Sequence, residues 1–86
     1  MIDPYLVIAT REVLAGRHPK HYVALYLYRR GGLKLDQIGE ILGVNRKPAA
    51  SLVRRAAELV DAKRQIPVGK WIDCQDAFSE AIKRKA

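Results

Sequence analysis

The stretch of sequence that decides the fold runs from Leu35 to Arg54 and is LDQIGEILGVNRKPAASLVR. Gly43 stands where a tight turn between two helices would pass through the left-handed backbone conformation, which glycine adopts without strain. Four residues upstream, Gly39 supplies the small residue needed where two such helices approach closely. The positions that this arrangement buries are all apolar, namely Ile38, Leu42, Val44, Ala49 and Leu52. Together these constraints predict a helix-turn-helix.

The pattern predicts helices over about Lys34–Leu42 and Arg46–Lys63, with Asn45 as the N-cap of the second helix. In helix-turn-helix proteins, the N-terminal part of the second helix enters the major groove of DNA. Here that helix carries no acidic residue before Glu58, whereas Asp36 and Glu40 lie on the preceding helix. Pro48 fits the first turn, because its missing N–H would have no partner within the helix. The positions predicted to be exposed are Asn45, Arg46, Lys47, Pro48, Ala50, Ser51, Arg54 and Arg55.

The chain has 86 residues and a formal net charge of +7, from 16 Lys and Arg against 9 Asp and Glu. So strong a positive bias in a small chain favours polyanionic partners, and we expect binding to double-stranded DNA. The residues expected to meet the major groove are Asn45, Arg46, Lys47, Ser51 and Arg54. Those expected to contact the DNA backbone are Arg17, Lys20, Lys34 and Arg55.

The first segment has the pattern of an amphipathic helix. Asp3 and Pro4 are typical of a helix start, and Gly16 is typical of its end. Thr10 and Arg11 interrupt the apolar pattern, which indicates a solvent-exposed face. The inner stripe would consist of Leu6, Ala9 and Val13.

The segment from Pro19 to Arg30 is the most apolar in the chain, and its uniform hydrophobicity predicts a central, buried helix. A β-strand is the alternative interpretation. However, Ala and Leu dilute the β-branched content, and the proline before the segment and Gly31-Gly32 after it fit the ends of a helix. We expect three tyrosines in the core with their hydroxyls at its rim, namely Tyr22, Tyr26 and Tyr28.

The last predicted helix begins at Asp73 and ends near Lys85, after a loop over 66–69. Asp73 would be the N-cap, with Asp76 in a capping-box-like position. The inner stripe of this helix would be Ala77, Phe78, Ala81 and Ile82. The sequence therefore predicts an all-α, five-helix compact domain that spans residues 1–86.

The composition, with 49% hydrophobic and 29% charged residues, is typical of a globular domain. The sequence has no apolar run of membrane-spanning length and does not start like a signal peptide. We expect a cytoplasmic, nucleoid-associated protein with no membrane partner. Cys74, the only cysteine, has no partner for a disulfide or a zinc site, and His18 and His21 lack further metal ligands nearby. We expect Cys74 to be a small, partly buried apolar residue.

A basic stretch, a long apolar helix and a string like Ser-Leu-x-Glu-Ile-Gly follow one another between His18 and Glu40. Leu35, Ile38 and Gly39 match that string. Residues 76–82, DAFSEAI, lie within the predicted last helix. In these features, and over nearly the whole chain, the sequence resembles the C-terminal DNA-binding domain of the bacterial replication initiator DnaA.

The resemblance implies a helix-turn-helix domain in which Arg17 and Lys20 belong to a basic region that reaches DNA beside the recognition helix. The family's signature Gly-Gly-Arg-Asp-His-Thr-Thr-Val is absent, and residues 43–50 are GVNRKPAA instead. The family's nucleotide-binding module is absent too, since no Gly-x-x-x-x-Gly-Lys-Ser/Thr string occurs. The chain also lacks a nucleophile elbow and a His-Glu-x-x-His string, so we expect neither a cofactor nor an enzyme.

The first functional hypothesis is a sequence-specific DNA-binding protein, a small bacterial, phage or mobile-element regulator of transcription or replication, acting as a monomer or homodimer. The alternative is a protein-interaction module derived from the same fold, such as an antiactivator or initiation regulator, with an exposed apolar patch. Its candidate residues are Ile66, Val68 and Trp71, although Trp71 could instead anchor the last helix in the core. RNA binding is a third alternative, but the chain lacks the aromatic platform of single-strand readers.

Overall fold

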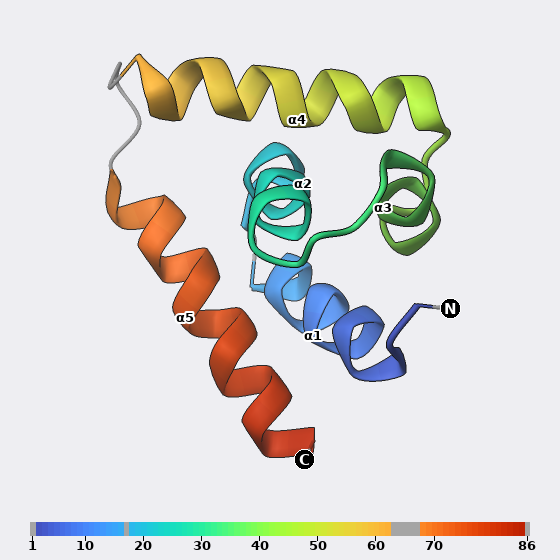
Figure 1. Ribbon diagram of the computed structural model, residues 1–86. Helices are drawn as coiled ribbons and strands as arrows, with labels where there is room; N and C mark the ends of the chain where they lie inside the picture. Colours follow the sequence, from blue (N-terminus) through green and yellow to red (C-terminus); the bar gives the residue numbers. More distant parts are fainter. Residues whose placement is uncertain (1, 17, 63–67, 86) are drawn as a thin grey trace.

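Every described element of the chain is a helix (Figure 1). The computed structural model describes residues 2–16, 18–62 and 68–85, without the side chains of residues 68–73, 82, 84 and 85. No strand occurs in these ranges, and the predicted all-α, five-helix fold is confirmed. The helices are α1 (Pro4–Ala15), α2 (Lys20–Arg29), α3 (Leu35–Leu42), α4 (Arg46–Asp61) and α5 (Val68–Lys85).

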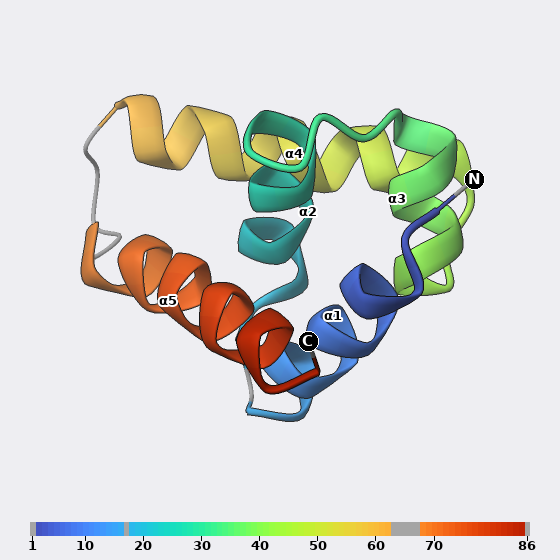
Figure 2. The same cartoon turned by 60° about the horizontal axis from the view of Figure 1, so that its bottom comes forward.

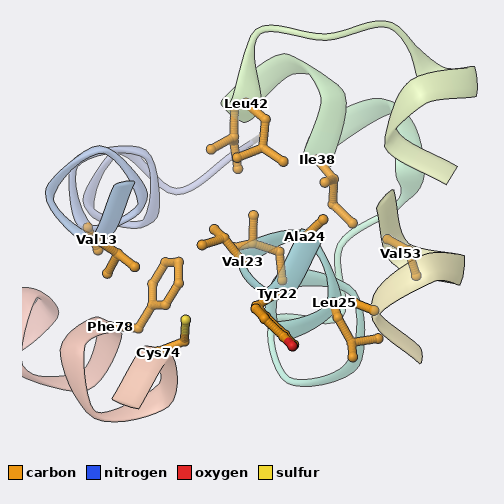
Figure 3. Packing of buried hydrophobic residues seen from close by; sticks show 14 of the residues in the cluster. Val13, Tyr22, Val23, Ala24, Leu25, Ile38, Leu42, Val53, Cys74 and Phe78 are labelled. Carbon is orange, nitrogen blue, oxygen red and sulfur yellow. The ribbon is translucent and has the colours of Figure 1, made fainter. Parts of the chain in front are cut away.

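Helix α2 is central, as its uniformly apolar sequence predicts. It packs against all four other helices. In Figure 1, α4 crosses it on one side, and α1 and α5 lie on the other. Figure 3 shows Val23 directed towards Phe78 of α5, and Leu25 directed towards Val53 of α4. Burial on several sides of one helix means that α2 holds the other helices together; its buried residues are Tyr22, Val23, Ala24, Leu25 and Leu27.

The three tyrosines of α2 lie in different environments. Tyr22 is 2% exposed, and burial raises the pKa of its phenol. Tyr26 is half-buried and stacks on Phe78, with ring centroids 4.5 Å apart. Tyr28 was predicted to lie in the core, but it is 47% exposed. The difference arises because Tyr28 is in the last turn of α2, beside the exposed residues 29–32, where the helix reaches the surface.

Helix α1 begins and ends as predicted. The Asp3 carboxylate accepts the backbone N–H of Tyr5 at 2.9 Å, and Gly16 is the C-cap. Thr10, expected to interrupt the apolar pattern on an exposed face, is instead completely buried. Its hydroxyl donates to the carbonyl oxygen of Leu6 at 2.8 Å. Because this hydrogen bond lies within the helix, Thr10 can be buried without an unsatisfied polar group.

Helix α5 begins at Val68, five residues before the predicted start, so Asp73 lies inside the helix and is not its N-cap. The predicted loop was wrong for Val68 and Gly69, which belong to the first turn. Glycine lowers helix stability by only about 0.5–1 kcal/mol even in a helix interior, so it does not require a break. Towards the core, α5 presents residues spaced four and three apart, namely Cys74, Phe78 and Ala81, which are buried.

Cys74 is completely buried, more so than predicted. Its Sγ lies 3.2 Å from Nδ1 of His18, in the segment between α1 and α2. The thiol therefore packs in the core of α1, α2 and α5 (Figure 3) and also contacts a polar partner at the edge of that core.

The turn between α3 and α4 has the predicted glycine geometry. Gly43 is left-handed, with φ of 73°, and ends α3. A Cβ on Gly39 would lie 2.5 Å from the carbonyl oxygen of Val44 and 3.3 Å from that of Asn45. The two helices can therefore be joined by this short turn only because position 39 lacks a side chain. Of the positions predicted to be buried around the turn, Ile38, Leu42 and Ala49 are buried, and Val44 and Leu52 are half-buried.

A bidentate ion pair joins the C-terminal ends of α2 and α4. The two terminal nitrogens of Arg29 donate to the two carboxylate oxygens of Asp61, at 3.2 and 2.9 Å. Hydrogen bonding from Arg29, supported by its charge, holds the pKa of Asp61 below its ordinary value. This contact ties the far end of α4 to the central helix.

We predict that Gly39→Ala lowers the free energy of unfolding by about 1–3 kcal/mol, because the new methyl group collides with the backbone of the turn. Alanine would otherwise stabilise a helix relative to glycine, so a loss of stability is diagnostic. Urea denaturation measures the effect. Gly16→Ala is the matched control, since a Cβ there meets no atom closer than 3.4 Å. If both variants are equally stable, the close approach does not constrain the turn.

We also predict that Asp61→Asn slightly lowers the melting temperature at pH 7, by a few degrees at most, since the ion pair is exposed. The pKa of Asp61 is lowered by folding, so its contribution is present above the unfolded-state pKa of about 4 and is lost as the pH falls further. The difference between wild type and variant should therefore disappear in acid. Glu58→Gln, a neighbouring exposed carboxylate on α4, is the control. An equal effect of both variants at every pH would contradict the prediction.

Candidate nucleic-acid interface

Helix α4 lies along one edge of the molecule (Figure 1). Helices α2 and α3 pack on its inner side, and no described helix lies beyond its outer side in this view. Its inner side is apolar, and Ala49, Val53 and Ala56 are buried there. With 16 residues, the helix is about 24 Å long. An element of this length and accessibility can present one whole face to a partner.

The outer side of α4 carries a basic row, defined as Lys47, Ser51, Arg54 and Arg55. All four residues are exposed. Their spacing of three and four residues places them on one side of the helix. The exposed acidic residues of α4, Glu58 and Asp61, are confined to its C-terminal end. The first three turns therefore present cations and a hydroxyl without a carboxylate on the same helix.

The start of α4 agrees with the prediction in position but not in every contact. Asn45 is the N-cap residue, yet its side chain makes no capping hydrogen bond, so the expected side-chain cap is absent. Its carbonyl oxygen accepts the N–H of Ala49 at 3.1 Å, which is the first bond of the helix. Pro48 lies in the first turn, where its missing N–H leaves no helical hydrogen bond unmade. The exposed Asn45 carboxamide can therefore be used for another contact.

Arg46, the first residue of α4, contacts a carboxylate on α3. Its Nε lies 3.7 Å from Oδ1 of Asp36, and both side chains are 71% exposed. The sequence did not predict this contact, because no local pattern relates two residues that are ten positions apart and on different helices. The geometry of the turn brings them together, since Asp36 lies one helical turn before Gly39, where the backbone of Val44 and Asn45 approaches α3.

The remaining predicted residues are distributed over several elements. Lys34 is the exposed N-cap of α3, and its backbone N–H donates to Oε1 of Gln37 at 2.9 Å. Lys20 is exposed at the start of α2, where the chain arrives from α1 (Figure 2), so the structure does not bring it into the basic row. Arg17 lies outside the described residues. The structure thus places Lys34 next to the helix-turn-helix and leaves Lys20 apart from it.

The apolar patch of the alternative hypothesis falls outside the described side chains. Ile66 is not described, nor are the side chains of Val68 and Trp71. Among the described residues, the large apolar side chains with the highest exposure are Tyr5, Ile8 and Tyr28.

A hollow of about 200 Å³ lies between α1, α5 and the segment before α2. Glu12 and Glu80 contribute carboxylates to its wall, and His18 contributes an imidazole. Its lining includes no residue of α3 or α4. The hollow is therefore separate from the basic row and differs from it in chemistry.

None of the described helices combines the length and the apolar character needed to cross a membrane. Comparisons of the chain with protein family models, with curated proteins and with solved structures found no match. Function is therefore inferred from the geometry of α3 and α4.

We predict that Asn45→Ala changes the free energy of unfolding by less than about 0.5 kcal/mol, because the side chain makes no capping hydrogen bond. An N-cap side chain that does make this bond typically contributes about 1 kcal/mol. Asp3→Ala, which removes the observed cap of α1, should show that larger loss. Urea denaturation of the two variants compares the caps directly. An equal or larger loss for Asn45→Ala would show that its side chain caps α4 in solution.

Proposed function

We propose that the protein binds double-stranded DNA by placing the N-terminal half of α4 in the major groove. The observation that carries this proposal is the basic row of Lys47, Ser51, Arg54 and Arg55, which is exposed on the outer side of the second helix of a glycine-hinged pair. A helix with its side chains is about 10–12 Å across and fits a major groove about 12 Å wide. The protein would act as a binding protein, not as an enzyme.

The positions along α4 suggest separate roles in this complex. Arg46, Lys47 and Ser51 are in the first two turns, the part of a recognition helix that reaches base edges. Arg54 and Arg55 lie one turn further on, where they can contact phosphates on the walls of the groove. The acidic end of α4 would leave the groove, since Glu58 and Asp61 would be repelled by the DNA backbone.

Two features of the whole chain support the same function. The net charge of +7 favours association with a polyanion. The resemblance to the C-terminal domain of DnaA, based on the strings between His18 and Glu40, adds to the proposal on sequence grounds. We therefore infer a nucleoid-associated regulator of transcription or replication as the biological setting.

Salt titration of duplex binding tests the proposal. We predict that Lys47→Gln and Arg54→Gln each weaken binding several-fold at moderate salt. For Arg54→Gln, the loss of a phosphate contact should also reduce the slope of log affinity against log salt concentration by about 0.9. Arg11→Gln is the charge-matched control, since Arg11 is exposed on α1 and does not belong to the basic row.

Equal effects of the α4 variants and Arg11→Gln would show that binding depends only on net charge and would contradict the proposed interface. Capture of a protein partner by a preparation that does not bind duplex DNA at any salt concentration would favour the protein-interaction alternative.

A further inference from the structure

The contact between Arg46 and Asp36 leaves a specific part of the guanidinium group available. The ion pair engages Nε, whereas the terminal nitrogens Nη1 and Nη2 carry four of the five N–H donors of an arginine. The carboxylate is therefore at the side of the planar group, and the terminal edge extends beyond it. At 71% exposure, the Arg46 side chain can reach a partner with that edge.

The position of Asp36 is set by the fold. Asp36 lies in the first turn of α3, where the helix macrodipole favours a negative charge. It is three residues before Gly39, on the side of α3 that the backbone of Val44 and Asn45 approaches. The close approach at Gly39 thus brings the start of α4 within reach of this carboxylate.

We propose that Asp36 is a positioning residue that holds Arg46 for bidentate recognition of a guanine in the major groove. Guanine presents two adjacent acceptors there, O6 and N7, which match the terminal edge of a guanidinium group. Adenine has an amino donor in place of O6 and is not bound in this way. The inference rests on the proposed DNA binding and adds to it one base of the target site.

Other roles of Asp36 explain the contact less well. An exposed ion pair contributes little to stability. The Asp36 carboxylate lies beside the first residue of α4, which would face DNA. There it also repels phosphates, so it would weaken binding to any duplex. A positioning role accounts for its place, because an arginine held in one orientation loses less side-chain freedom on binding.

The first step of the test identifies the base. Duplexes bound by the wild-type protein are selected from a random pool, and each guanine of the selected duplex is then replaced singly by 7-deazaguanine, which lacks N7. We expect one replacement that weakens wild-type binding about 5-fold or more, because it removes one of the two hydrogen bonds of the bidentate contact and leaves O6 in place. The same replacement should not weaken duplex binding by the Arg46→Ala variant any further.

The second step tests Asp36 itself. Asp36→Asn should reduce the wild-type discrimination against that 7-deazaguanine duplex at least two-fold, while its binding to unselected duplex becomes slightly tighter. Glu40→Gln is the matched control. It removes the same charge from the same helix, but Glu40 lines a hollow together with Ile2 and with Val7 of α1. In the Arg46→Ala background, Asp36→Asn should leave discrimination unchanged. Thermal melts confirm that each variant is folded.

Each remaining outcome overturns the inference. If Asp36→Asn and Glu40→Gln have the same effect on discrimination, Asp36 acts only through its charge. If a selected duplex is bound but no guanine depends on Arg46, the guanine contact is wrong while the proposed DNA binding stands. If the wild type binds no duplex at all, the proposed function fails and this inference fails with it.

Discussion

The close approach of Gly39 to the carbonyl oxygen of Val44 is the constraint on which the candidate interface depends. It allows a three-residue turn to join α3 and α4, and the left-handed Gly43 completes that turn. The direction of α4 follows from this geometry, because its apolar side must then face α2 while its basic row faces outward. The pairing of Arg46 with Asp36 is a second result of the same approach.

The sequence predicted those features that are encoded by local periodicity or by a backbone requirement. The uniform hydrophobicity of α2 indicated a central helix, and Asp3 indicated the start of α1, because a short-range hydrogen bond fixes both the residue type and its position. The roles of Gly39 and Gly43 were predictable for the same reason, since few other residues fit such a backbone. The exposure of the basic row followed from the helical repeat of α4.

The predictions were wrong for residues whose local preference did not decide their place in the structure. Asp73 has the properties of an N-cap, but the helix continues through it because an aspartate does not prevent helical structure upstream. Thr10 is polar and nevertheless buried, since its own helix satisfies the hydroxyl. Asn45 occupies a cap position without capping. The ion pair between Arg29 and Asp61 joins residues 32 positions apart, and no sequence pattern marks such a pair.

The packing of α4 has a consequence for how the helix would meet a ligand. Its apolar side, with Ala49, Val53 and Ala56, is buried against α2 and α3, and ion pairs add a contact to α3 at its first residue and to α2 at its last. A helix held in this way cannot swing as a lever about the turn. The protein would therefore dock as a preorganised rigid body, with little conformational change between its free and its bound form.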